Sequence, residues 1–135
     1  MPIWGATAHV AGARVYWLCD VFKETRIGKT PYSGVTVGWE DDVAHPRSVE
    51  ELVWALESSW QIVLATLQRW TPEVMAEEFT RVRDGELQRH SRQSVVTRLV
   101  THDAFHVGEI SQTLGMHGFA EVDPWSSPGG ARLNP

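Results

Sequence analysis

The clearest alternation of apolar and polar positions lies mid-chain, in VEELVWALESSWQIVLATLQRW, residues 49–70. Apolar residues recur there at the three- and four-residue spacing of one helix face. Ser48 precedes the stretch, and Glu51 three residues later completes a capping box. The pattern predicts a long helix after Ser48 whose buried stripe comprises Val49, Leu52, Val53, Leu56, Trp60, Val63, Leu64 and Leu67.

Two further segments have helical patterns. One begins near Ser91 and runs through VVTRLVTHDAFHVGEISQTLG, with Gly115 placed to end it. Its apolar stripe contains two histidines and consists of Val95, Leu99, His102, His106, Ile110 and Leu114. The other is the start of the chain, MPIWGATAHVAGARVYWLCDVF, where Pro2 suits a first helical position and His9 lies within the helix.

The remaining segments predict connections. Residues 23–47 are rich in Gly, Pro and charge, form a long loop, and contain a weak extended pattern, YSGVTVGW. Thr71-Pro72 can open a short helix to about Phe79, and Asp84-Gly85 is a turn signal. With three long helices and no convincing sheet, we expect an all-α protein, an antiparallel helix bundle. We expect one domain over residues 1–125 and a flexible tail over 126–135.

The composition of the chain limits the classes of molecule that it is expected to bind. The chain has 135 residues, 42% of them hydrophobic, a formal net charge of -5 and no dense Lys/Arg run. These features argue against nucleic acid or an anionic membrane as partner and favour a small molecule or another protein. The single cysteine, Cys19, is expected to be buried, and without a leader or a long apolar run a cytoplasmic protein is the default expectation. Most of the seven tryptophans are expected in the core, with Trp39 and Trp125 freer to line a pocket.

The histidine pair carries the candidate chemistry. His102 and His106 lie one helical turn apart, so their imidazoles can reach a common metal ion, although the same spacing fits two histidines hydrogen-bonded in a core. A metal site needs a further ligand from a facing helix, and His9 is suitably placed. Glu109 shares the stripe as a further ligand or an outer acceptor. Asp103 is rotated about 100° away and is expected to meet solvent or a neighbouring helix.

Other site types fit less well. A zincin helix has glutamate directly after its first histidine, where this chain has Asp103, and nothing downstream supplies a clear third zincin ligand. His45, His90 and His117 are expected at the surface or in turns. Tyr16 and Trp17 flank the face that carries His9, and we expect them to pack rather than to shape a pocket.

Three segments carry a resemblance to a known family: ATAHVAGARVYWL, RLVTHDAFHVGEISQTL and DPW. Their combination and order resemble the DinB-like superfamily of metal-dependent proteins, in particular its DUF664-type branch. The resemblance implies a four-helix bundle, often dimeric, in which His9, His102 and His106 bind a divalent metal such as zinc or nickel. It also implies a complete helix before the one that bears His9, which this sequence lacks. Either the start of the sequence is recorded too late, or the helix has been lost, in which case we expect a homodimer that covers the exposed side.

The family includes thiol S-transferases that use bacillithiol or mycothiol, and hydrolase-like members. Our preferred hypothesis is therefore an enzyme that transfers or activates a low-molecular-weight thiol cosubstrate at the three-histidine metal. The alternatives are a metal-dependent hydrolase and a non-catalytic bundle that binds metal or a small ligand and acts through dimerisation. From its place on the helix, Glu109 is either a residue outside the ligand set that orients a histidine or accepts the displaced proton, or a solvated or salt-bridged helix residue.

Overall fold

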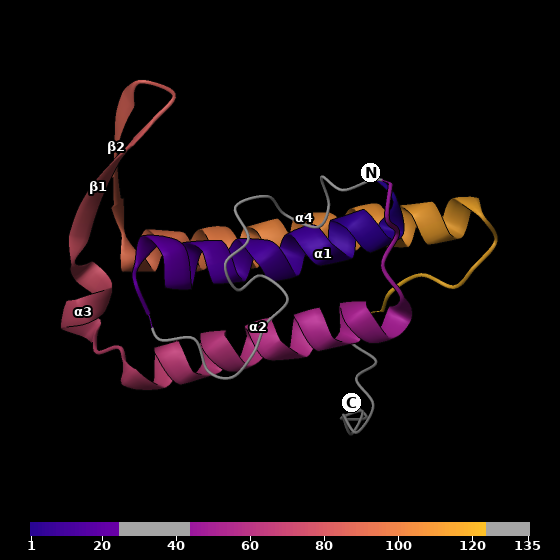
Figure 1. The fold of residues 1–135 in the computed structure, drawn as a ribbon, viewed down its shortest axis with the longest axis horizontal. Helices are drawn as coiled ribbons and strands as arrows, with labels where there is room; N and C mark the ends of the chain where they lie inside the picture. Colours follow the sequence, from indigo (N-terminus) through magenta and orange to yellow (C-terminus); the bar gives the residue numbers. More distant parts are fainter. Residues whose placement is uncertain (25–43, 124–135) are drawn as a thin grey trace, which may run out of the picture.

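Three long helices form the body of the molecule in the computed structural model, which describes residues 1–24 and 44–123. They are α1 (Ile3–Val15), α2 (Val49–Arg69) and α4 (Arg92–Met116), and they lie along one long axis (Figure 1). A π-helical segment, η1 (Tyr16–Val21), continues α1. The short helix α3 (Pro72–Ala76) and strands β1 (Glu78–Arg83) and β2 (Glu86–Ser91) connect α2 to α4. No helix in the described ranges has the length and apolar character needed to cross a bilayer.

Several sequence predictions lie outside the described residues. These are most of the loop over 23–47 with its weak extended pattern, the pocket-lining role of Trp39 and Trp125, and the tail over 126–135.

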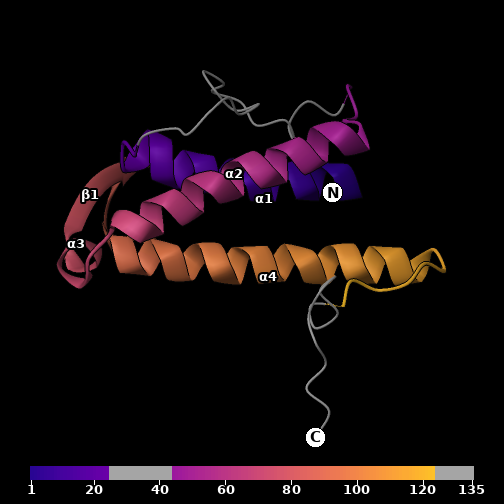
Figure 2. The ribbon, with the colours of Figure 1, turned by 90° about the horizontal axis from the view of Figure 1, so that it is seen from below.

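The first helix is the centre of the bundle, with α2 on one side and α4 on another (Figure 2). One buried cluster joins the first helical segment to α2 and consists of Ala11, Val15, Leu18, Cys19, Ala55 and Ile62. A second joins it to α4 and consists of Trp17, Val95 and Leu99. Cys19 is therefore buried, and Trp17 packs in the core, as predicted. The same prediction is wrong for Tyr16, Trp54 and Trp60, whose side chains are exposed.

The helix directions refine the predicted antiparallel arrangement. Glu24, just after η1, accepts hydrogen bonds from Trp70 Nε1 at 2.8 Å and from Arg69 Nη2 at 2.6 Å, so α1 and α2 finish at the same end. Trp17, near that end, packs against Val95 in the first turn of α4. Helix α4 therefore runs antiparallel to α1, as predicted, whereas α1 and α2 run parallel to each other (Figure 1).

The predicted starts of the two longest helices are confirmed. Ser48 Oγ accepts from the Glu51 backbone N–H at 3.2 Å, and Glu51 Oε2 accepts from the Ser48 N–H at 2.8 Å, which forms the capping box. Ser91 Oγ likewise accepts from the Ser94 N–H at 3.1 Å. Each bond satisfies a donor that the helix itself leaves unpaired.

The predicted buried face of α2 is confirmed only at some positions, because Leu56 and Val63 pack against the buried cluster whereas most of the predicted stripe is exposed. Its fully buried residues are small or polar, apart from one isoleucine: Ala55, Ser59, Ile62 and Thr66. The predicted stripe instead contains exposed side chains, namely Val49, Val53, Trp60, Leu64 and Leu67, with Trp60 50% exposed. Small side chains let α2 approach the alanine-rich α1 closely, so the larger apolar residues lie on the opposite side.

A two-stranded antiparallel hairpin corrects the prediction of an all-α protein without a sheet. Strands β1 and β2 pair from Glu78 with Ser91 to Arg83 with Glu86. The turn residues Asp84 and Gly85 both have positive φ, 54° and 82°, which suits a tight hairpin turn. The short helix expected to reach Phe79 ends at Ala76, because the chain there enters β1.

The predicted single helix at the start of the chain changes its form after Val15. In η1 the Phe22 N–H donates to the Trp17 carbonyl oxygen at 3.1 Å, five residues back instead of four. This wider turn brings the consecutive residues Trp17, Leu18 and Cys19 all into buried positions.

Candidate metal centre

Three histidines meet where α1 and α4 lie side by side. His9 comes from α1, and His102 and His106 come from α4. One ligand nitrogen from each ring lies within 4.8 Å of the others. His106 is 7% exposed, and the other two are partly buried. The structure therefore brings together the residues that the sequence singled out, from positions more than 90 residues apart.

Hydrogen bonds indicate which nitrogens face the centre. His9 Nε2 and His102 Nε2 lie 3.0 Å apart. His106 Nδ1 lies 2.6 Å from Glu109 Oε2, which leaves the Nε2 of His106 available. At most one proton fits between two facing nitrogens, so at least one lone pair points inward. Neutral imidazoles that share a common space are a donor set that zinc and nickel accept.

The electrostatic setting favours the neutral form of His102. Burial lowers the pKa of His102 from its ordinary value, and the neighbouring rings of His106 and His9 lower it further, whereas Asp103 opposes these effects. A lowered pKa keeps this ring uncharged near neutral pH, and a metal binds only the uncharged form.

Two carboxylates adjoin the histidines in different ways. Glu109 bonds to His106, and its side chain is 42% exposed, so it lies between the cluster and solvent. Asp103 pairs with Arg14 of α1 at 2.7 Å. Asp103 therefore meets a neighbouring helix, one of the two positions predicted for it.

The comparison with protein families identifies the chain. A model of the DinB superfamily matches residues 1–110. The chain belongs to the DinB superfamily. The match includes all three histidines and Glu109. No curated protein and no solved structure matches the chain.

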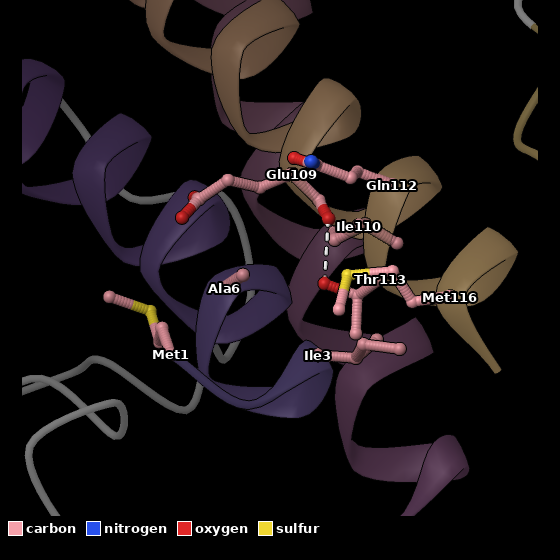
Figure 3. A pocket seen from close by; sticks show the side chains of 8 residues that line it. All are labelled: Met1, Ile3, Ala6, Glu109, Ile110, Gln112, Thr113 and Met116. Atoms are coloured by element: carbon pink, nitrogen blue, oxygen red, sulfur yellow. Dashed lines mark hydrogen bonds between the residues drawn. The ribbon is translucent and has the colours of Figure 1, made fainter.

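This DinB-superfamily chain also has a small pocket that the sequence did not predict. The cavity, about 200 Å³, lies between the start of α1 and the end of α4 (Figure 3). Its walls are mixed, with five apolar residues and three polar ones: Met1, Ile3, Ala6, Ile110 and Met116, and Glu109, Gln112 and Thr113. Glu109 is shared with the histidine cluster, which makes the two sites neighbours. The lining residues come from opposite ends of the sequence, so no local pattern could have indicated the pocket.

The other singled-out residues lie away from the cluster. His45 and His117 are exposed, as predicted. His90 differs from its prediction, because it lies in β2 and packs against Trp17 and Phe79 at ring-centroid distances of 5.5 and 5.6 Å. Burial, and then the charges of Arg81 and Arg98, lower the pKa of His90.

Proposed function

We propose that this DinB-superfamily chain is a metal-dependent enzyme that activates a low-molecular-weight thiol for transfer to an electrophilic substrate. His9, His102 and His106 are the proposed ligands of a divalent ion such as zinc or nickel. The observation that carries the proposal is the convergence of three imidazole nitrogens, within 4.8 Å, from two helices. Three nitrogen donors leave coordination positions open, which is typical of catalytic sites. An ion held there would supply the positive charge that favours the nucleophilic thiolate over the thiol.

The residues around the cluster have separate tasks in this proposal. Glu109 accepts the hydrogen bond from His106 Nδ1 and thereby fixes the orientation of that ring. Because the Glu109 side chain is 42% exposed, it can also carry a displaced proton to solvent. The adjoining cavity, with Met1, Ile3 and Ile110 in its walls, suits a short apolar part of the substrate.

The experiment combines metal analysis with a thiol-dependence assay. We expect the purified protein to contain one divalent ion per site, and alanine at each of the three histidines to reduce that content. The metal-loaded protein is then assayed with bacillithiol or mycothiol and an electrophilic acceptor, beside ester and amide substrates. Turnover that requires the thiol supports the proposal. Hydrolysis without thiol favours the hydrolase alternative, and full metal content in all three alanine variants would contradict the ligand assignment.

We also propose that the protein is a homodimer, and this proposal rests on the exposed face of α2. Val53, Trp60 and Leu67 lie along one side of the helix with exposed fractions of 45%, 50% and 40%. An apolar stripe of this kind on a protein surface commonly lies in an interface. A second copy of the chain, packed along this stripe, is the partner we propose.

A further inference from the structure

A charged pair joins three helices next to the histidine cluster. Asp103 Oδ2 accepts two hydrogen bonds from Arg14, from Nε at 3.1 Å and from Nη2 at 2.7 Å. Arg14 Nη1 also donates to Ser59 Oγ of α2 at 3.4 Å. The Arg14 side chain is 15% exposed and that of Asp103 26%, so solvent screens the pair only partly. The position of the Asp103 carboxylate is therefore fixed from α1.

Only one oxygen of Asp103 is used by this pair. Asp103 Oδ1 is buried and has no hydrogen-bond partner. His102 Nδ1 is also buried and also lacks a partner. These two atoms lie 3.8 Å apart, which is just beyond hydrogen-bond length. A buried polar atom left unpaired costs about 1–3 kcal/mol, so two such atoms facing each other call for an explanation.

Metal binding at His102 would supply the missing bond. His102 Nε2 faces His9 Nε2 at 3.0 Å and is therefore the nitrogen directed into the cluster. When Nε2 gives its lone pair to a metal, the neutral ring must carry its proton on Nδ1. That proton then points to the side where Asp103 Oδ1 lies, and a shift under about 1 Å closes the bond.

We propose that Asp103, held in place by Arg14, is a positioning residue that accepts the Nδ1 proton of His102 and so selects the tautomer that binds metal. This inference rests on the proposed function, since it needs an ion at the histidines. It gives His102 the kind of oriented partner that His106 has in Glu109. If the ion pair had only a structural role, the strongest arrangement would be a bidentate one in which Arg14 bonds to both oxygens of the carboxylate. Here both donors of Arg14 bond to Oδ2, and Oδ1 is left on the side of the imidazole.

The test is the substitution Asp103→Asn. The amide oxygen can still accept from Arg14, but its NH2 group then faces His102 Nδ1 and favours the tautomer with the proton on Nε2. We expect the affinity for zinc, measured by competition with a chelator, to fall about 10- to 100-fold. The visible spectrum of the cobalt(II)-loaded protein should also change, because the His102 ring is held differently.

The matched control is Glu24→Gln, which weakens a different ion pair, the one that joins the end of the first helical segment to Arg69 of α2 at 2.6 Å, at the far end from the histidines. It should lower the thermal stability of the metal-free protein while leaving zinc affinity and the cobalt spectrum unchanged. If Asp103→Asn does not fold, Arg14→Lys is measured instead. It replaces the two hydrogen bonds from Arg14 to Asp103 with a single donor and should cause a smaller loss of zinc affinity.

Three results would overturn the inference. If Asp103→Asn binds zinc as tightly as the wild type, the proposed role of Asp103 is contradicted, while the metal proposal stands. The same holds for Arg14→Lys if that variant is measured instead. An equal loss in Glu24→Gln shows that a general loss of stability explains the effect. A wild-type protein that binds no zinc, nickel or cobalt removes the proposed function and this inference together.

Discussion

Replacing His9 with alanine tests the metal centre through protein stability. His9 is contributed by α1, whereas His102 and His106 both lie on α4, so an ion held by all three ties the two helices together. An ion at about 100 times its Kd stabilises the folded state by about 2.7 kcal/mol. One kcal/mol corresponds to roughly 2–8 °C in Tm for domains of about this size. We therefore expect zinc or nickel to raise the wild-type Tm by roughly 5–20 °C, and that of His9→Ala by much less.

Calorimetry of metal-free and metal-loaded samples provides the assay and its control. His9 Nε2 and His102 Nε2 lie 3.0 Å apart, and loss of that hydrogen bond costs about 1 kcal/mol. The metal-free variant should therefore unfold roughly 2–8 °C below the metal-free wild type, so the rise caused by metal is measured against each protein's own metal-free sample. The variant His117→Ala, at an exposed histidine, should keep the full metal-dependent rise. An equal rise in wild type and His9→Ala would refute the assignment, and no rise in either would indicate a hydrogen-bonded cluster of histidines.

Three further predictions address other parts of the structure. Glu109→Gln should lower metal affinity less than His106→Ala, since Glu109 acts through the ring; equal losses in a chelator competition would make Glu109 a ligand. Trp60→Glu should shift the protein from dimer to monomer in sedimentation, whereas Trp54→Glu, about 120° away around α2, should not; monomeric wild type would contradict the interface. The unfolding free energy of the metal-free protein should fall as the pH drops below 6.5, because burial and two arginines lower the pKa of His90 and the unfolded chain binds the proton more readily. Urea titrations should show a shallower fall for His90→Phe, and equal slopes would refute this.

Local chemistry made the helix starts and the histidine pair predictable. The capping box of Ser48 and Glu51 involves residues three apart, and His102 and His106 are neighbours on any helix. The turn at Asp84-Gly85 was visible too, but its flanking residues are mostly polar or charged and lack the apolar alternation that indicates strands. The hairpin therefore depends on contacts such as His90 with Trp17, which are distant in sequence.

The buried face of α2 could not be read from hydrophobicity. The usual rule places Trp60 and Leu64 inside, yet Ala55 and Ser59 are fully buried and those larger residues are exposed. The choice depends on which face of α2 fits against α1, and that is a matter of shape rather than polarity. The same limit applies to Arg14 and Asp103, whose pairing joins residues 89 positions apart and leaves no local pattern.

The π-helical segment η1 gives the first helix one extra residue at its aromatic end. Because a π-helical turn takes up one residue more than an α-helical turn, removing one residue between Tyr16 and Val21 would restore the α-helical repeat. His9 and Arg14 before the segment and Glu24 after it would then keep their places in the bundle. The consecutive residues Trp17, Leu18 and Cys19 would no longer all be buried, so a one-residue deletion at this point can change the aromatic end of the bundle and leave the three clustered histidines in position.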